Sequence, residues 1–398
     1  MAHEEIDRRK FLRNSLIGGA GALLSSSLIA QQKETGHTPE KETRPLITRP
    51  LGKTGILLPI VSFGVMRADS PALIKAAIAA GMVHFDTAHV YQNGKNEELL
   101  GAIFQQYKRD AYVISTKVPP TTGEPAAVKK TFLEKLDLSL KRLKMDHVDI
   151  LYVHGSGSRA EALAPEMLEA VTAAKKAGKA KHVGVSTHRS EPEVIRAAIE
   201  SGVYEVVLAS VNFKQEHIAE VRKAIAEAAK AGIGIIAMKT MAGGFHDKER
   251  TKPINCSAAL KYVLADENIT TAIPGITNFD QLAMNAAVNR DVVLTAEEEK
   301  DLAALDNLRD GLYCQGCMQC VPDCPKALPI PDLMRAYMYA YGYNDNAQAH
   351  SLVTSLDLED QPCAGCTACT VSCAKQFAVS ERITDIMRIR RVPAEFMT

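Results

Sequence analysis

The chain has 398 residues, with 47 basic and 47 acidic side chains, so its formal net charge at neutral pH is zero. A balanced charge gives no reason to expect nucleic acid or a strongly acidic surface as a partner. Hydrophobic residues make up 46% of the chain, which is ordinary for a globular protein. The length exceeds one average domain and suits a barrel of about 250 residues with a smaller second unit.

The first thirty residues have the form of an export signal. The run Asp7–Leu12 (DRRKFL) precedes an apolar run, Leu16–Ala30, that is rich in Gly, Ala and Ser. A basic stretch before a short apolar segment is typical of secretory signals, and paired arginines before Phe-Leu resemble the twin-arginine type. An ordinary basic, amphipathic N-terminus is the alternative. We expect a twin-arginine signal in residues 1–30, a linker in residues 31–47 and a periplasmic protein, attached to the membrane only if the signal is not cleaved.

Short apolar runs alternate with longer amphipathic runs from about residue 48 onward. Eight strand–helix repeats over roughly 250 residues are typical of a (β/α)8, or TIM, barrel, which is an α/β fold. A doubly wound open sheet is the alternative, but no Gly-x-Gly-x-x-Gly turn follows the first strand. We therefore expect a barrel over residues 48–308, with a hairpin at Gly52–Gly55 and a closing helix at Thr295–Leu308. The expected strands are Val61–Met66, His84–Tyr91, Tyr112–Val118, Val148–His154, His182–Thr187, Val206–Asn212, Ile233–Met238 and Thr271–Ile276, and the expected helices include Ala126–Leu143, Glu161–Ala177 and Glu216–Ala231.

Four polar residues stand at the expected strand ends, where chemistry is located on this fold. Asp86 and Tyr91 lie near the second strand, Lys117 on the third and His154 on the fourth. Each alone would be an ordinary solvated or structural group. Together they supply a phenol, an ammonium that lowers the pKa of the phenol, a carboxylate that holds the ammonium, and an imidazole that orients a substrate oxygen.

The segments around these residues resemble the aldo-keto reductase family. The resemblance covers about residues 48 to 308 and implies a nicotinamide-dependent reductase. It implies that Tyr91 is the general acid, that Lys117 and Asp86 tune it, and that His154 aligns the substrate carbonyl. The matching segments, in the family's order, are His84–Tyr91 with Asn93, Gly94 and Asn96–Gly101, then Ile114–Lys117, Leu151–His154, Gly184–Ser186 and Ile273–Gly275.

The resemblance also implies a site for NADP or NAD. In that site Ser186 and Asn212 would hold the carboxamide and Asn285 the adenine. Where the family has an aromatic residue that stacks on the nicotinamide, this chain has Met238-Lys239. We expect Lys239 either to reach the pyrophosphate instead or to be an ordinary surface lysine.

A further departure from the family concerns the choice of dinucleotide. The family's Lys and Arg that pair with a 2′-phosphate appear here as Gly275 and Gln281. Each charge-assisted hydrogen bond lost in this way is worth roughly 1.5–3 kcal/mol. We therefore expect little discrimination between NADP and NAD.

Eight of the nine cysteines lie in the last quarter of the chain, in two C-x-x-C-x-x-C-x-x-x-C runs. This is the spacing of bacterial proteins with two [4Fe–4S] clusters, in which three thiolates hold one cluster and the fourth reaches the other. Zinc sites usually pair two C-x-x-C knuckles, so the additional x-x-C fits zinc badly, and disulfides fit worse. The expected ligands are Cys314, Cys317, Cys320 and Cys324 in the first run and Cys363, Cys366, Cys369 and Cys373 in the second.

The C-terminal region resembles the dicluster ferredoxin domains that are appended to aldo-keto reductases. The resemblance implies that Cys373 joins the first three cysteines at one cluster and that Cys324 joins the second three at the other. Pro331 stands at an expected first helical position, so we expect a small, mainly helical ferredoxin-like domain over residues 309–398. The ninth cysteine, Cys256, is expected to be an inert buried thiol, and Tyr337, Tyr339, Tyr341 and Tyr343 are expected to serve packing.

Two functions from different classes fit these patterns. The first is an oxidoreductase that passes hydride between NADP or NAD and a small aldehyde or ketone, with two [4Fe–4S] clusters that exchange electrons with a redox partner protein. The second is an electron-transfer or redox-sensing iron–sulfur protein that uses the barrel as a scaffold. The four candidate catalytic residues favour the enzyme, whereas the missing stacking aromatic and phosphate-binding cations favour the scaffold.

Overall fold

The computed structural model describes residues 44–121, 123–303, 311–366, 368–393 and 396–397. The expected signal, most of the expected linker and the expected boundary near residue 308 lie outside the described residues. Within the described ranges, no helix has the length and apolar character needed to cross a membrane.

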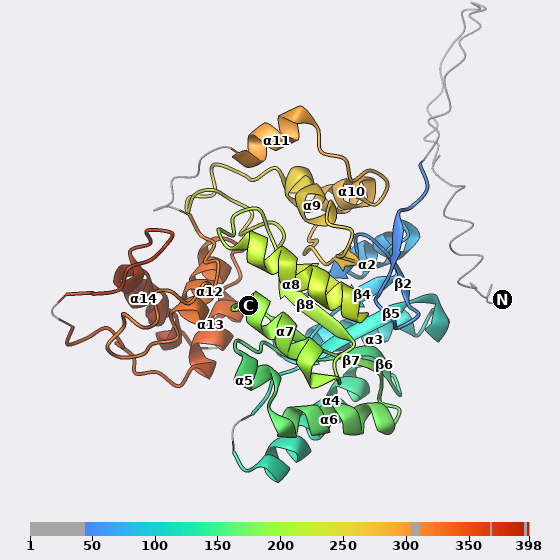
Figure 1. Ribbon diagram of the computed structural model, residues 1–398, viewed down its shortest axis with the longest axis horizontal. Coiled ribbons are helices and arrows are strands. Elements are labelled where there is room, and N and C mark those ends of the chain that lie inside the picture. Colours follow the sequence, from blue (N-terminus) through green and yellow to red (C-terminus); the bar gives the residue numbers. More distant parts are fainter. Residues whose placement is uncertain (1–43, 122, 304–310, 367, 394–395, 398) are drawn as a thin grey trace, which may run out of the picture.

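Eight parallel strands form a closed barrel in the described part of the chain (Figure 1). Their order around the sheet follows the sequence from β3 to β10. Parallel bridges from Val61 to Ala272 and from Gly64 to Gly275 join the last strand to the first. The predicted barrel is therefore confirmed. Its strands are β3 (Phe63–Gly64), β4 (His84–Asp86), β5 (Val113–Val118), β6 (Val148–Val153), β7 (Ala180–Thr187), β8 (Val206–Ser210), β9 (Gly234–Met238) and β10 (Thr271–Ala272).

The second strand is shorter than the predicted range His84–Tyr91. β4 ends at Asp86, and Tyr91 begins a 3₁₀ turn, η1 (Tyr91–Gly94). Within that turn Gln92 and Asn93 adopt φ values of 49° and 53°, which an extended strand cannot contain. The assignment of Tyr91 to a strand is therefore wrong, and the residue lies on the loop that leaves the barrel.

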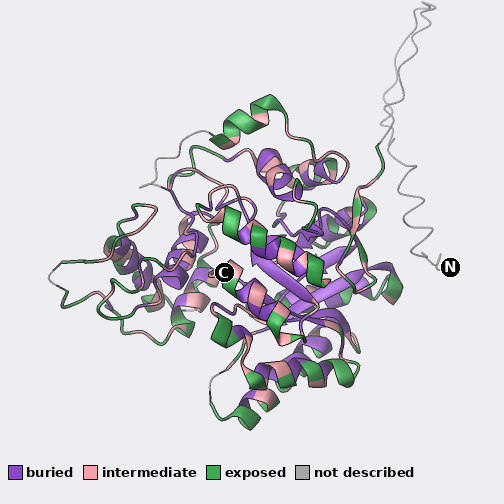
Figure 2. Ribbon diagram, in the orientation of Figure 1, coloured by how far each residue is buried: buried purple, intermediate pink, exposed green. Residues whose placement is uncertain are grey.

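Helices surround the barrel and most of them bury one face, whereas α11 (Ala296–Ala303) has no buried residue (Figure 2). In α8 the buried residues Val221, Ala224, Ile225 and Ala228 follow the helical spacing of three and four. The predicted helix Glu161–Ala177 is divided in two, because Pro165 lacks an N–H and starts a new helix. The helices are α2 (Pro71–Ala79), α3 (Lys95–Phe104), α4 (Pro125–Leu143), α5 (Arg159–Ala162), α6 (Pro165–Lys176), α7 (Glu191–Ser201), α8 (Ile218–Ala231), α9 (Cys256–Leu264), α10 (Phe279–Val288) and α11 (Ala296–Ala303).

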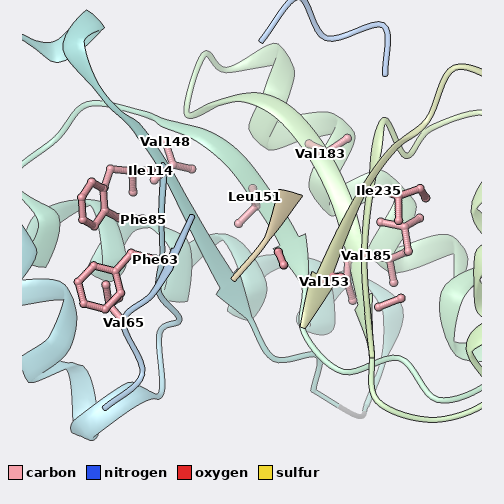
Figure 3. Packing of buried hydrophobic residues seen from close by; sticks show 14 of the residues in the cluster. Phe63, Val65, Phe85, Ile114, Val148, Leu151, Val153, Val183, Val185 and Ile235 are labelled. Atoms are coloured by element: carbon pink, nitrogen blue, oxygen red, sulfur yellow. The ribbon is translucent and has the colours of Figure 1, made fainter. Parts of the chain in front are cut away.

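The main hydrophobic core lies between the strands and this ring of helices, and Figure 3 shows Phe63, Phe85 and Ile114 within it. A second cluster fills the barrel itself and includes Leu51, which is fully buried. Leu51 follows β1 (Thr48–Pro50), which pairs antiparallel with β2 (Leu57–Pro59). The predicted hairpin is thus confirmed, and it closes the end of the barrel opposite the carboxyl ends of the strands.

Residues 311–393, which we name the tail, fold as helices where they are regular. These are α12 (Ile330–Tyr341), α13 (Asn346–Ser355), α14 (Val379–Met387) and the 3₁₀ turn η3 (Arg388–Arg391). Pro331 occupies the first turn of α12, as the sequence predicts. The tail shares a hydrophobic cluster with the loops that follow the strands, where Ala242 and Ile254 of the barrel pack with Leu312 and Leu333. The tail is therefore joined to the barrel at the carboxyl ends of the strands.

Candidate active site

Three of the four expected catalytic side chains are in direct contact. Lys117, at the end of β5, has only 1% of its side chain exposed and forms an ion pair with Asp86, at the end of β4. The same ammonium donates hydrogen bonds to the Tyr91 hydroxyl at 3.2 Å and to the Thr87 carbonyl at 2.7 Å. The parallel register of β4 and β5 brings these strand ends together, although the residues are far apart in the sequence.

The Asp86 carboxylate is fixed through both of its oxygens. Oδ1 contacts Lys117, and Oδ2 accepts a hydrogen bond from the Ser115 hydroxyl at 2.6 Å. The Ser115 oxygen in turn lies 2.9 Å from Nε2 of His84. His84 with Asp86, and Ser115 with Lys117, are alternate residues on neighbouring strands, so their side chains share the inner face of the barrel. Strand alternation could have revealed Ser115 and His84, which sequence reasoning missed.

His154 follows β6 and faces the Tyr91 ring, with the ring centroids 6.1 Å apart and the planes at 84°. Burial lowers the pKa of His154 well below 6.5, and the charges of Lys117, Arg335 and Lys239 lower it further. The imidazole is therefore neutral at neutral pH, and one of its nitrogens can donate a hydrogen bond to a substrate oxygen. This arrangement agrees with the aligning role that the sequence implies.

The ionisation of Tyr91 differs from the expectation. Burial raises its pKa above 10, and Asp86 and Tyr339 raise it too, so Lys117 and Lys239 do not bring it down. Burial also acts against the charge on Lys117, but Asp86 and Tyr91 together outweigh it, so the pKa of Lys117 rises. The prediction that the pKa of Tyr91 is lowered is wrong, because it considered the nearby Lys117 ammonium but not the burial of the phenol. Tyr91 is a protonated phenol beside a fixed ammonium.

The residues expected to hold a dinucleotide have buried polar atoms without partners. Asn212 Oδ1 accepts a hydrogen bond from the backbone N–H of Lys214, whereas its Nδ2 faces the Tyr313 hydroxyl and makes no hydrogen bond of good geometry with the described residues. Asn285 Nδ2 donates to the Gln281 carbonyl, and within the same ranges its Oδ1 is unpartnered. The Ser186 hydroxyl accepts from the Gly155 N–H at 2.9 Å. Unpartnered buried amide atoms mark places where a ligand would be accommodated, so this donor set fits a dinucleotide.

The tail covers the mouth of the barrel. Lys239, just after β9, donates a hydrogen bond to the Tyr339 hydroxyl of α12 at 3.2 Å, and Tyr313 is buried beside Asn212. The cavity left between barrel and tail, which we name the mouth cavity, has a volume of about 20 Å³. It holds about one water-sized group. It is lined by His188, Ser210 and Lys239 of the barrel and by Tyr313, Cys314, Gly316, Pro331, Arg335 and Met338 of the tail.

The eight clustered cysteines are free thiols that fall into two groups in space. Burial raises the pKa of Cys314 to about 12, and the neighbouring Cys373, Cys320 and Cys317 add to this. The pKa of Cys363 is raised by burial and then by its neighbours Cys369, Cys366 and Cys324. These groups are the ones that the resemblance implies. Cys373, from the second run in the sequence, joins the first group, and Cys324, from the first run, joins the second group.

The second group of thiols surrounds a cavity of about 250 Å³ rather than meeting at a point. Among the described residues, no three His, Cys, Asp or Glu side chains are arranged around a single metal ion. Thiols that hold a multi-iron cluster lie around its body, whereas zinc thiolates all lie about 2.3 Å from one ion. The number and type of these thiols are those that a four-iron cluster needs. The four cysteines in the cavity lining are Cys324, Cys363, Cys366 and Cys369.

Comparison with known proteins places the barrel in a family. Residues 62–258 match the model described as the aldo/keto reductase family. These residues form an aldo/keto reductase domain. The match ends within α9, so β10, α10 and the tail lie outside it.

Individual relatives agree with the family. L-galactose dehydrogenase of Arabidopsis thaliana is 22% identical over 297 residues, which are 65% of this chain and 92% of that protein. L-glyceraldehyde 3-phosphate reductase of Escherichia coli K12 is 32% identical over 160 residues, 35% of this chain and 45% of that protein. A probable voltage-gated potassium channel subunit beta of Arabidopsis thaliana is 33% identical over 117 residues, 26% of this chain and 36% of that protein. The last two alignments span less than half of the relatives' lengths.

Solved structures share the fold. An aldo-keto reductase of Bacillus halodurans in its holo form has a TM-score of 0.55 at 21% identity, and covers 68% of this chain and 99% of its own. The family match and the relatives named as a dehydrogenase and a reductase indicate that the barrel is an oxidoreductase domain.

Buried neutral histidines predict a stability that falls in acid. Burial lowers the pKa of His84 and of His89 to about 4, and it lowers those of His154 and His188 well below 6.5. In the unfolded chain these groups take up protons near pH 6.5, so between about pH 4 and 6.5 the unfolded state binds more protons and stability rises with pH. For His84 alone the difference corresponds to about 3 kcal/mol.

We therefore expect the free energy of unfolding to drop by several kcal/mol between pH 7 and 4.5, as measured by urea denaturation at stepped pH. The variant His89→Gln should reduce the slope. A free energy of unfolding that stays constant over this range would contradict the burial of these imidazoles in neutral form.

Proposed function

We propose that the protein reduces a small aldehyde or ketone with a hydride from NADP or NAD, and that its tail holds two [4Fe–4S] clusters that exchange electrons with a partner protein. The observation that carries the reductase proposal is the contact of Tyr91, Lys117 and Asp86 opposite a neutral His154, at the carboxyl ends of the strands. Active sites on this fold occupy that edge, and the four groups together can bind and protonate a carbonyl oxygen.

The chain's own residues would act as follows. His154 donates a hydrogen bond to the carbonyl oxygen and orients it toward Tyr91. Tyr91 gives that oxygen its proton, and the fixed Lys117 ammonium stabilises the negative charge left on the phenol oxygen. Ser186 and Asn212 would hold the carboxamide of the dinucleotide and Asn285 its adenine. A bound nicotinamide supplies the hydride.

The tail cysteines would hold the clusters in the two spatial groups already described. The exchange of Cys373 and Cys324 between the sequence runs supports this proposal, as does the cavity of about 250 Å³ at the second group. Clusters of this kind carry single electrons. Cys314 of the first group also lines the mouth cavity, so the first cluster would lie beside the barrel site.

The closed mouth favours the second candidate function, an electron-transfer or redox-sensing protein with the barrel as scaffold. Tyr313 is buried beside Asn212, and the mouth cavity of about 20 Å³ leaves no room for a nicotinamide ring. On the reductase proposal, this part of the tail has to move before a dinucleotide can reach Asn212.

For the location, we propose export by the twin-arginine route. The proposal rests on Arg8 and Arg9 before Phe11 and Leu12. This route carries folded proteins, which suits a chain whose clusters are assembled in the cytoplasm. Free reduced dinucleotide is not expected outside the cytoplasm, so an exported reductase would carry its dinucleotide tightly bound.

Anaerobic purification followed by iron, sulfide and nucleotide analysis tests these proposals. We expect about eight iron and eight sulfide per chain, falling to about half in Cys317→Ser, because two four-iron clusters have separate thiol sets. The variant Cys256→Ser is the control and should keep its iron, because that thiol lies on α9 of the barrel.

The nucleotide analysis separates the two candidate functions. Bound NADP or NAD, or carbonyl reduction on its addition, supports the reductase. Protein that has its full iron content but neither contains a dinucleotide nor reduces a carbonyl would support the scaffold function. Iron-free protein with full carbonyl reduction would show that the reductase does not need the clusters.

A further inference from the structure

Tyr91 lies on a loop with an unusual backbone conformation. The three residues that follow it, Gln92, Asn93 and Gly94, have φ values of 49°, 53° and 91°, all in the left-handed region. Residues with a side chain rarely adopt this region, and two in succession persist only where the surrounding contacts fix them. The place of the Tyr91 phenol therefore depends on the contacts that fix this loop.

The guanidinium of Arg142, near the C-terminal end of α4, contacts the loop on both sides of Tyr91. Its Nη1 donates a hydrogen bond at 2.9 Å to the carbonyl of His89, which precedes Tyr91. Gly94, which follows Tyr91, packs directly on the guanidinium, since a Cβ atom at this glycine would lie 2.2 Å from Arg142 Cζ. One side chain thus bridges the two ends of the segment that carries the phenol.

Arg142 is itself fixed by a buried carboxylate. Its Nη1 also contacts Glu97 Oε2 at 3.2 Å, and the side chain of Glu97 is fully buried. Glu97 Oε1 accepts a hydrogen bond from the Thr116 hydroxyl at 2.7 Å. Thr116 stands next to Lys117 on β5. The guanidinium that holds the loop and the ammonium that contacts Tyr91 are therefore fixed relative to the same strand.

A further anchor of the loop lies after Tyr91. Gln92 Nε2 donates hydrogen bonds to the carbonyl of Met66 at 3.1 Å and to that of Ala68 at 3.4 Å, in the segment that follows β3. This anchor holds the chain on one side of the phenol. Arg142, in contrast, contacts the chain before and after it.

We propose that Arg142 is a positioning residue for Tyr91, which holds the phenol at the distance from Lys117 and His154 at which it can deliver its proton. The effect on the reaction rests on the proposed reductase function, whereas the placement of the loop does not. Without the guanidinium the left-handed segment can relax toward commoner backbone conformations, and the phenol then leaves the Lys117 ammonium, which it now meets at 3.2 Å. A displacement of about 1 Å at a reacting group can lower a rate about a hundredfold.

Kinetics of the full-length protein with its metal content intact test the effect on the reaction. Arg142→Met should lower kcat about ten- to a hundredfold, and it should change KM and dinucleotide affinity less than about twofold. The matched control is Arg109→Met, because Arg109 forms a similar ion pair with Asp149, at 2.7 Å, just before β5 and at the end of the barrel opposite the site. Arg109→Met should lower Tm, as Arg142→Met does, but leave kcat unchanged.

A double variant separates positioning from a general loss of structure. In protein that already carries Tyr91→Phe, Arg142→Met should cause no further loss of kcat, because Arg142 acts through the hydroxyl that is absent. Losses that multiply in the double variant would overturn the proposal. If Arg142→Met does not fold, Arg142→Lys takes its place, because it keeps a positive charge beside Glu97 but lacks the planar fork that packs on Gly94. It should lower kcat about tenfold.

The place of Tyr91 can also be measured without turnover, by NMR of protein labelled with carbon-13 at the tyrosine ζ-carbons. The Tyr91 resonance, identified by its absence in Tyr91→Phe, should shift or broaden in the Arg142 variants and stay unchanged in Arg109→Met. An unchanged resonance in a folded Arg142 variant would overturn the positioning role. A displaced resonance in a protein that reduces no carbonyl, even as the wild type, would keep that role and remove the reductase.

Discussion

Tyr91→Phe is expected to lower kcat for carbonyl reduction about a thousandfold, within the range of roughly 10²–10⁴ that a positioned general acid contributes. The reason is geometric. Tyr91 is the hydroxyl in contact with Lys117 and facing His154, and the neighbouring Lys117 is held charged by Asp86. Dinucleotide affinity should change less than about twofold, because the lost hydroxyl contacts the substrate and not the residues proposed for the cofactor. Steady-state kinetics and fluorescence titration with the dinucleotide measure the two quantities.

Tyr107→Phe provides the matched control, since this tyrosine is partly buried against Phe104 on the outside of the barrel. It should leave both kcat and dinucleotide affinity unchanged. Near wild-type turnover in Tyr91→Phe would show that the proton comes from another group, and Tyr339 would then be the next hydroxyl to replace.

The second large effect concerns stability. Lys117→Met is expected to lower the free energy of unfolding by about 3–5 kcal/mol, because it leaves the Asp86 carboxylate buried without its cation. Removing both charges in Asp86→Asn with Lys117→Met should restore part of that loss. Denaturation with guanidinium chloride, followed by circular dichroism, measures both values.

Lys129→Met is the control for this experiment. Lys129 pairs with Glu169 at 3.2 Å on the exposed surface, and such pairs contribute less than about 1 kcal/mol. The loss of unfolding free energy in the double variant could instead equal the sum of the losses in Asp86→Asn and in Lys117→Met. The two charges would then act independently, and the ion pair would not explain the loss.

The barrel could be predicted from the sequence because its strands and helices follow local patterns. Alternating apolar runs indicated all eight strands near their observed positions, and the polar residues at four strand ends indicated the edge that holds the site. The errors fall where local pattern is insufficient. The end of β4 depends on the positive φ of Gln92 and Asn93, and the division of a helix at Pro165 depends on one missing N–H.

The contribution of the tail to the site was not predictable in the same way. Tyr339 and Arg335 lie on a helix whose sequence indicates packing, and nothing local says that this helix faces Lys239, a hundred residues earlier. The raised pKa of Tyr91 has the same origin, because its main cause is burial, which depends on everything packed around it. The spacing of the cysteines, in contrast, indicated the groups in which the structure places them.

The hydrophobic cluster that joins Ala242 and Ile254 to the tail also has a consequence for the order in which the molecule is made. On the ribosome the barrel emerges first, and the segment that closes its mouth emerges after it, because the tail follows the barrel in the sequence. The nascent barrel therefore exposes its strand ends and Lys239 to the surroundings until the tail has been translated. A ligand whose entry the docked tail would block can reach the strand ends in that interval, before the tail docks.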